Sequence, residues 1–186
     1  NGITLLGDTL KFVAGPQTDY FRSPDGSVVN NSAVIFTEVD NTKPFTFTAK
    51  VQPEFTETGT YSAGVIYAYE NDTHCQKLCF EQDEYGDHRV VSVRTLGTSD
   101  DNNHQAITAP YVYMRLSSDG TTLGSYFSED GKIWRMARLY KNDFPEKLLI
   151  GISSQSPKDN EHTCLFTEVS LTDKPVADFR KGNIAE

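Results

Sequence analysis

The chain has 186 residues, of which 37% are hydrophobic and 11% aromatic, and it carries a formal net charge of -9. This acidic balance disfavours sequence-independent binding to nucleic acid or to an anionic membrane, because both need a basic surface on the protein. No apolar run approaches the ~20 residues that a membrane-spanning helix needs. We therefore expect no nucleic-acid partner and no membrane partner. The length predicts a single domain over residues 1–186.

The first half of the chain contains a succession of short strand patterns. Residues 3–13 predict a strand pair that ends at Gly15-Pro16, and a strand over residues 33–39 follows the turn at residues 24–26. Residues 45–51 alternate strictly between apolar and polar side chains, which is typical of a half-buried antiparallel strand. Residues 63–70 are apolar on both faces and predict a central strand that is covered on both sides.

Two further runs, residues 76–81 and 90–94, also alternate. The positions expected to face inward are Leu78, Phe80, Val91 and Val93. The opposite face then collects the charged residues Lys77, Glu81 and Arg94. Residues 98–103 are rich in Asp and Asn, and this composition predicts a loop.

The stretch from Tyr111 to Tyr140 holds two Asp-Gly pairs, Asp119-Gly120 and Asp130-Gly131, between alternating runs. Asp-Gly in this setting is a strong hairpin signal, because both central residues of a type I′ turn need positive φ. The stretch therefore predicts a three-stranded meander. Its alternation predicts one aliphatic face and one aromatic and basic face, the latter made of Tyr111, Tyr113, Arg115, Trp134, Arg138 and Tyr140.

The end of the chain adds a buried strand over residues 148–157 and an alternating strand over residues 164–171. The polar tail after Asp173 is expected to be peripheral. No helical period extends for three turns, and no unit repeats at a fixed period. Ten to twelve short strands with regular turns predict a β-sandwich or barrel.

The three cysteines, Cys75, Cys79 and Cys164, are an odd number, which argues against a disulfide framework. If Cys75 and Cys79 share a strand, a rise of ~3.3 Å per residue puts them ~13 Å apart, too far to bridge. This favours a reducing, cytoplasmic location. Glycosylation sequons at Asn30 and Asn71 point the other way, but such sequons arise by chance in a chain rich in Asn, Ser and Thr.

Several blocks, taken in order, resemble a known family. They are residues 18–22 (TDYFR), 45–53 (FTFTAKVQP), 63–66 (AGVI), 77–81 (KLCFE), 90–103 (VVSVRTLGTSDDNN), 126–140 (YFSEDGKIWRMARLY) and 150–157 (IGISSQSP). The ordered set resembles the concanavalin A-like family that includes the yeast "regulation of enolase" protein and is related to sandwich domains appended to some glycoside hydrolases. The resemblance implies an all-β fold: a two-sheet antiparallel β-sandwich, or concanavalin A-like jelly roll, with a concave face. It also implies intracellular members in fungi.

Two positions depart from the pattern of that family. Tyr20 and Phe21 stand where the resemblance leads us to expect a Phe and Trp pair, and Cys79 stands where the family usually has a small residue. If that tryptophan stacks on a ligand in relatives, the contact is altered here.

On the alternation argument, one face of the sheets collects aromatic, basic and acidic side chains that suit a groove for a sugar or a peptide. The candidate ligand-binding residues are Lys77, Glu81, Arg94, Asp100, Tyr113, Arg115, Tyr126, Trp134, Arg138 and Gln155. The alternative is a face whose charges pair with one another in solvent while a loop covers Trp134 and the tyrosines. The pattern alone does not choose between them.

Catalytic patterns are weak. A retaining glycosidase needs two carboxylates ~5 Å apart, commonly spaced as Glu-x-Asp-x-Glu, but residues 81–85 (EQDEY) place the third carboxylate on the wrong face. Glu81 and Asp100 remain as an alternative inverting pair. There is no Gly-x-Ser-x-Gly motif, and the four histidines lie in polar, loop-like stretches where solvated side chains are expected. We predict no catalytic residue.

Metal-binding patterns are equally weak. Cys75, Cys79, His162 and Cys164 have the chemistry of zinc ligands without a recognisable finger spacing. Residues 100–103 (DDNN) could supply oxygen ligands to calcium, but the EF-hand spacing is absent and an Asx-rich turn is favoured. Residues 128–134 resemble the sialidase Asp-box, yet their Asp and Gly adjoin and indicate a hairpin. We expect no metal and no cofactor.

These observations lead to two hypotheses of function. The first is a non-catalytic concanavalin A-like recognition protein in the cytoplasm, whose partner is a carbohydrate or a protein. In its sharper form, implied by the resemblance alone, it regulates sugar metabolism through a glycolytic enzyme such as enolase. The second is a carbohydrate-binding module or a glycoside hydrolase-related domain that binds glycans in the concave groove.

Overall fold

A computed structural model describes residues 2–185, and within them fifteen strands and no helix make up the regular structure. One sheet has seven strands in the order β1 (Gly2–Leu6), β2 (Thr9–Ala14), β15 (His162–Thr172), β6 (Phe45–Pro53), β11 (Val112–Ser118), β12 (Thr122–Ser128) and β13 (Arg135–Lys141). The other has six in the order β10 (Thr98–Ala106), β9 (His88–Leu96), β8 (His74–Gln82), β7 (Ala63–Asn71), β14 (Lys147–Gln155) and β5 (Ile35–Asp40). A hairpin of β3 (Tyr20–Arg22) and β4 (Val28–Asn30) stands apart from both.

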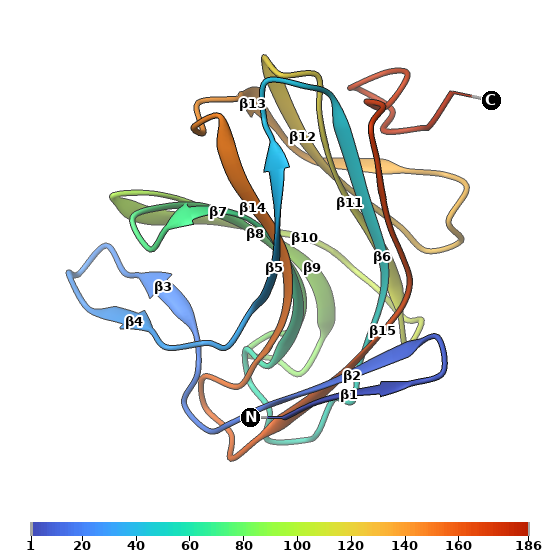
Figure 1. The fold of residues 1–186 in the computed structure, drawn as a ribbon. Helices are drawn as coiled ribbons and strands as arrows, with labels where there is room; N and C mark the ends of the chain where they lie inside the picture. Colours follow the sequence, from blue (N-terminus) through green and yellow to red (C-terminus); the bar gives the residue numbers. More distant parts are fainter. Residues whose placement is uncertain (1, 186) are drawn as a thin grey trace.

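The two sheets face each other, and the hairpin β3–β4 lies on the far side of the six-stranded sheet (Figure 1). Strands distant in sequence pair with each other: β15 lies between β2 and β6, and β14 lies between β7 and β5. Every pairing is antiparallel, and the prediction of a two-sheet antiparallel β-sandwich is confirmed. The described residues hold more strands than the ten to twelve expected. No helix among them is long and apolar enough to cross a membrane.

The main core lies between the two sheets. Strand β6 turns Phe45, Phe47, Ala49 and Val51 inward, as its alternation predicts, and all four are buried. The six-stranded sheet contributes Ile66, Leu78, Phe80, Val90 and Ile150 to the same cluster. Burial of such side chains contributes roughly 1.5–3 kcal/mol each and is the main source of stability of the sandwich.

A second apolar layer lies on the other face of the six-stranded sheet. It is formed by Ala63, Val65, Tyr67, Cys79, Val91 and Val93, and it is covered by residues that include Tyr20, Phe21 and Phe36. Strand β7 is therefore buried on both faces, as expected. The expectation that Val91 and Val93 point into the core between the sheets is wrong, because they belong to this second layer. Their neighbours Ser92 and Arg94 point toward the other sheet instead.

Two turn and loop predictions need correction. The meander β11–β12–β13 forms as expected, but in its Asp-Gly turns Gly120 and Gly131 have positive φ and the aspartates do not, so the turns are not type I′. The Asp119 carboxylate accepts hydrogen bonds from the N–H groups of Thr121 and Thr122. Residues 98–103 form part of the edge strand β10, not a loop, because their backbone pairs with β9.

Gly64 marks a close approach between the sheets. A methyl group at this position would lie 2.3 Å from the Cys164 sulfur and 2.4 Å from a Val51 methyl group, and both neighbours are buried. We expect Gly64→Ala to lower the free energy of unfolding by about 2 kcal/mol, the usual cost of overpacking a core, as measured by urea denaturation. The loss should shrink in a Cys164→Ala background, where the clashing sulfur is gone. A Gly64→Ala protein as stable as the wild type would contradict this packing.

Candidate functional site

The predicted site residues do not share one face. The structure distributes them over three places: the outer face of the seven-stranded sheet, one edge of the sandwich between the sheets, and a pocket on the concave face of the six-stranded sheet. Alternation along a strand predicts which side chains share a face of their own sheet. It does not predict which of two sheets a strand joins.

On the outer face of the seven-stranded sheet, the C-terminal tail covers part of the expected groove. Arg115 is buried and donates a hydrogen bond of 2.6 Å to the Gly182 carbonyl oxygen, and the Tyr126 hydroxyl donates one of 2.8 Å to the Phe179 carbonyl oxygen. The tail residue Val176 is also buried. Burial lowers the pKa of Arg115 to about 10. The tail is thus peripheral, with most of its residues exposed, but it packs on the outer face of the sheet through Val176 and Gly182.

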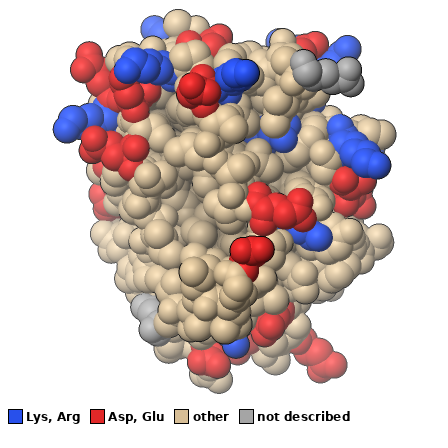
Figure 2. Space-filling model, turned by 45° about the vertical axis from the view of Figure 1, so that its right-hand side comes forward, with Lys and Arg blue, Asp and Glu red and all other residues tan. Residues whose placement is uncertain are grey.

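Trp134 and Tyr113 lie on the same outer face. The Arg115 guanidinium stacks on the Trp134 ring at 3.6 Å from the ring centroid, and the Tyr113 hydroxyl bonds Glu168. On the side of the molecule where β6 and β15 come forward, acidic and basic side chains are interspersed, and the view shows no extended basic field (Figure 2). Arg115 and Tyr126 hold the tail, whereas Trp134 and Tyr113 are only partly buried, so this face is covered in part and is not an open groove along its whole length.

Arg94, Arg138 and Asp100 lie at the edge of the sandwich where β9 and β10 approach β13. The Arg94 guanidinium lies 4.0 Å above the Tyr140 ring and bonds Asp143 at 2.6 Å. Arg138 donates to the Asp100 carbonyl oxygen at 3.2 Å. A register shift in the β12–β13 pairing sends Arg138 to the inner side, so that Arg138 and Trp134 do not share a face as expected.

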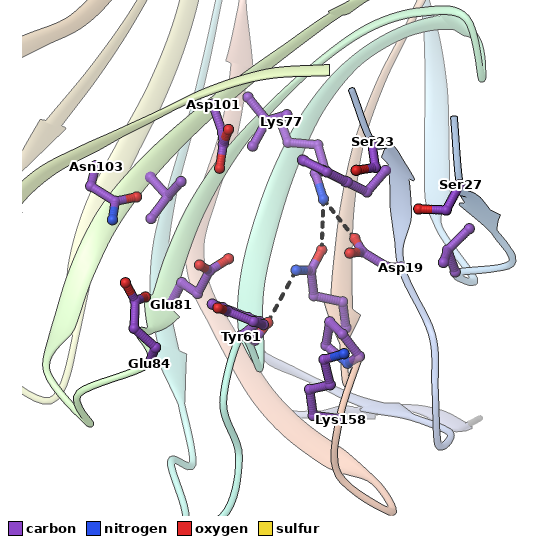
Figure 3. Close-up of a pocket in the computed structure, with 16 residues that line it drawn as sticks. Asp19, Ser23, Ser27, Tyr61, Lys77, Glu81, Glu84, Asp101, Asn103 and Lys158 are labelled. Atoms are coloured by element: carbon purple, nitrogen blue, oxygen red, sulfur yellow. Dashed lines mark hydrogen bonds and ion pairs between the residues drawn. The ribbon is translucent and has the colours of Figure 1, made fainter. Parts of the chain in front are cut away.

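The pocket on the concave face of the six-stranded sheet measures about 480 Å³ and contains the remaining predicted residues, Lys77, Glu81 and Gln155. Its floor is formed by β8, β9 and β10, and one wall by the residues that lead into and along the hairpin β3–β4. Other lining residues are Asp19, Phe21, Ser23, Ser27, Val29, Tyr61, Glu84, Val91, Val93, Asp101, Asn103, Pro157 and Lys158. Figure 3 shows Glu81, Glu84, Asp101 and Asn103 on one side of the pocket and Asp19 on the other, with Tyr61 between them.

One wall is built around Lys77, whose side chain is only 3% exposed. Its ammonium group donates to the Asp19 carboxylate at 2.7 Å and to the Gln155 amide oxygen at 3.1 Å. Burial opposes the charge of Lys77, but the facing Asp19 carboxylate outweighs it and the pKa of Lys77 is raised. The Gln155 amide nitrogen in turn donates a hydrogen bond to the Tyr61 carbonyl oxygen at 3.2 Å, which connects Lys77 to the Tyr61 backbone.

The opposite wall carries Glu81, Glu84 and Asp101. Glu81 is half-buried, and its carboxyl group forms no hydrogen bond or salt bridge with any residue between 2 and 185 that the structure describes. Burial raises the pKa of Glu81 to about 8; Lys77 opposes this, while Asp19, Asp101 and Asp83 add to it. Asp101 lines the pocket and Asp100 does not, so the alternative of an inverting pair made of Glu81 and Asp100 does not face one cavity.

Tyr61 projects into the pocket from the segment between β6 and β7. Its backbone has φ of 65°, a conformation that a tyrosine adopts rarely. Two hydrogen bonds keep Tyr61 in this backbone conformation: its N–H donates to the Gln82 carbonyl oxygen at 2.7 Å, and its carbonyl oxygen accepts from Gln155. The exposed Tyr61 ring and the Phe21 side chain give the pocket two aromatic surfaces.

Sequence reasoning missed Asp19, Tyr61, Glu84 and Asp101 as site residues. Asp19 and Tyr61 come from irregular segments, where no alternation fixes the direction of a side chain. Asp101 had a usable signal: if residues 98–106 are aligned as a strand, Asp101 and Asn103 share a face with each other and not with Asp100.

The alternative metal and histidine interpretations also change. Cys79 faces the concave side whereas Cys164 lies in the main core, so the four candidate zinc ligands do not converge, and no group of three metal-ligating side chains occurs within residues 2–185. The histidines are packed rather than solvated: His74 stacks on Phe144 and His88 on Phe55. His162 is buried, and burial lowers its pKa to about 4.

The sequence matches one described family over residues 4–174. The chain belongs to the family described as "Protein of unknown function (DUF1349)". No curated protein matches it in sequence. The match to this DUF1349 family spans both sheets and the whole pocket.

Solved structures share the fold. A functionally unknown protein from Saccharomyces cerevisiae superposes with a TM-score of 0.83 at 22% identity, over 92% of this chain and 91% of that chain. A GH43 protein from Bacillus licheniformis gives a TM-score of 0.68 at 14% identity, over 89% of this chain but 33% of that one. An alginate lyase from Pseudomonas aeruginosa gives 0.56 at 12% identity, over 92% and 86%. At these identities the likeness shows the sandwich fold alone, and this DUF1349 chain spans about a third of the GH43 protein.

Proposed function

We propose that this DUF1349 protein is a non-catalytic recognition domain that binds a saccharide in the pocket on the concave face. The observation that carries the proposal is the Glu81 carboxyl group, which lies half-buried in a pocket of about 480 Å³ without a protein partner. A carboxyl group that no protein group engages and that faces a concave site is free to accept or share hydrogen bonds with a ligand, which favours a polar ligand in this pocket.

The chemistry of the lining suits a sugar. Saccharides carry hydroxyl groups that both donate and accept hydrogen bonds, and one apolar ring face that stacks on aromatic side chains. The pocket offers a donor in the Lys77 ammonium, acceptors in Glu81 and Asp101, and the ring of Tyr61 as a stacking surface. Two structural neighbours are enzymes named for saccharides, a GH43 glycoside hydrolase and an alginate lyase, which supports a saccharide over other small polar ligands.

The test is a glycan array followed by titration of the hits. We expect Tyr61→Ala to weaken binding about tenfold, because loss of a stacked aromatic contact with the ligand costs roughly 1.4 kcal/mol. Trp134→Ala is the matched control: it also removes a large aromatic ring, but from the outer face of the other sheet, and should leave affinity unchanged. Binding that depends on Trp134 and not on Tyr61, or no binding to any glycan, would contradict the proposal.

A protein partner is the other form of the recognition hypothesis. Its sharper version, a cytoplasmic regulator acting on a glycolytic enzyme such as enolase, rests on the family resemblance described above. A pull-down from lysate with the wild type and with a Tyr61→Ala, Glu81→Gln double variant separates the two forms. A glycolytic enzyme that is captured equally well by both proteins would favour a partner surface outside the pocket.

A further inference from the structure

The charges of the pocket are unequal. Four carboxyl groups, those of Asp19, Glu81, Glu84 and Asp101, and two ammonium groups, those of Lys77 and Lys158, line it. Asp19 and Lys77 neutralise each other through their contact of 2.7 Å. Glu81, Glu84 and Asp101 then face one exposed lysine, Lys158. Even with the Glu81 carboxyl group protonated, two carboxylates outnumber that lysine, so the field inside the pocket favours a cation over an anion.

We propose that the ligand is a saccharide that carries a protonated primary amine, with its ammonium group against Glu81 and Asp101 and its hydroxyl groups against Lys77. This inference rests on the proposed function and adds the chemical class of the ligand. An ammonium group has three donors and no acceptor, which complements a wall that carries three carboxyl groups, those of Glu81, Glu84 and Asp101, beside the single amide of Asn103.

The wall of the pocket around Lys77 favours a saccharide over a simple amine. Lys77 is almost completely buried and uses two of its three N–H donors, on Asp19 and Gln155, among the residues that the structure describes. The Lys77 ammonium lines the pocket, and its third donor needs an acceptor. An amine without hydroxyl groups leaves this donor unmatched. An amino sugar satisfies both walls, because its ring hydroxyls accept from Lys77 while its amine donates to Glu81.

The same charges argue against acidic sugars. A uronate brings a carboxylate next to Glu81, Glu84 and Asp101, and the positive charge of Lys77 is already balanced by Asp19. Like charges at close range in a partly buried site cost several-fold to hundred-fold in affinity. The pocket therefore differs in its electrostatics from a site built for a polyuronate, although the sandwich fold is shared with an alginate lyase.

Binding of an ammonium group should release a proton. The ionisable groups that face or surround Glu81 are Lys77, Asp19, Asp83, Asp101, Glu84, Lys158 and Tyr61. Because the pKa of Glu81 is raised to about 8, its carboxyl group is protonated at pH 6.5 in the free protein. A cation at that carboxyl stabilises the carboxylate form, so the proton passes to the buffer as the complex forms. A neutral sugar provides no such stabilisation.

The experiment is isothermal calorimetry at pH 6.5 in buffers of different ionisation enthalpy. The probes are a glucosamine trimer, an N-acetylglucosamine trimer, cellotriose, a uronate trimer and the simple diamine cadaverine. We expect the glucosamine trimer to bind at least tenfold more tightly than the other four. Glu81 should lose close to one proton, after subtraction of the protons that the amines of the trimer take up on binding, which a titration of the free trimer gives. Glu81→Gln should abolish the proton release and reduce the preference about tenfold. Asp101→Asn, a milder change at an exposed position, should reduce the preference several-fold.

The matched control is Glu129→Gln, the same change at an exposed site between β12 and β13, which should alter neither quantity. Equal affinity for cellotriose and the glucosamine trimer would overturn the amine assignment and leave the proposed function standing. Equal affinity for cadaverine and the glucosamine trimer would overturn the saccharide part of the assignment. If none of the trimers binds, the proposed function and this inference both fail.

Discussion

Replacing Asp19 with asparagine is expected to lower the free energy of unfolding by about 3 kcal/mol. The variant leaves the buried ammonium group of Lys77 without its anionic partner, and removal of one member of a buried ion pair costs 3–5 kcal/mol in other proteins. The lower end applies because the Asp19 side chain keeps 15% of its exposure. Urea denaturation at neutral pH measures the loss.

A second variant separates the charge from the packing. Lys77→Met in the Asp19→Asn background removes the stranded charge and keeps an unbranched chain of similar length, so much of the lost stability should return. Asp8→Asn makes the same change in the exposed turn between β1 and β2 and should have no measurable effect. If Asp19→Asn costs less than about 1 kcal/mol, the pair is not the anchor of the pocket wall that its geometry indicates.

Lys77 also shows how far the sequence could predict the site. Alternation in residues 76–81 correctly separated the core positions Leu78 and Phe80 from Lys77 and Glu81, because a strand that is covered unequally on its two faces has a strict period of two. The same rule correctly described β6. The number of short strands predicted a sandwich or a barrel, since few arrangements of so many short antiparallel strands bury their apolar faces. The two-sheet sandwich was implied by the family resemblance of the ordered blocks.

The wrong predictions concern positions where alternation along a strand does not indicate which layer or which sheet the side chain packs against. Val91 and Val93 are apolar and were predicted to face the main core, but the segment around hairpin β3–β4 creates a second apolar layer on the other face of the same sheet. When both faces of a sheet carry an apolar layer, the sequence does not indicate which of the two layers a given valine belongs to. Arg115 and Lys77 were assigned to one groove for a related reason: each lies on a polar face, but of different sheets.

The rest of the site could not be predicted from the sequence because loops and a β-bulge position its side chains. Asp19 and Tyr61 are positioned by hydrogen bonds to strands that are distant in sequence, such as the bond between Tyr61 and Gln82. The register shift in β12–β13 reverses the direction of Arg138 relative to Trp134. Such features depend on tertiary contacts and leave only weak traces in local composition.

Glu81 is expected to lower the stability of the protein as the pH rises. Its pKa is about 8 in the folded protein and near 4.5 in the unfolded chain, so between these values the unfolded chain gives up a proton that the folded protein keeps. Below pH 4.5 both states are protonated and the residue has no effect. As the pH rises from about 4.5 to about 8, stability should fall by an amount on the order of 3 kcal/mol, given 1.36 kcal/mol per pKa unit and the partial exposure of the side chain.

Glu81→Gln removes this titration, and its stability relative to the wild type should therefore grow steadily between pH 4.5 and pH 8. The histidines with lowered pKa values, His88, His104 and His162, also titrate in this range, but they do so in both proteins and cancel in the difference. Glu129→Gln makes the same change at an exposed position and serves as the matched control. A flat difference for Glu81→Gln would mean that its carboxyl group is well solvated. A rising difference would show that the fold keeps a destabilising acid in its pocket, which is typical of a group retained for binding rather than for stability.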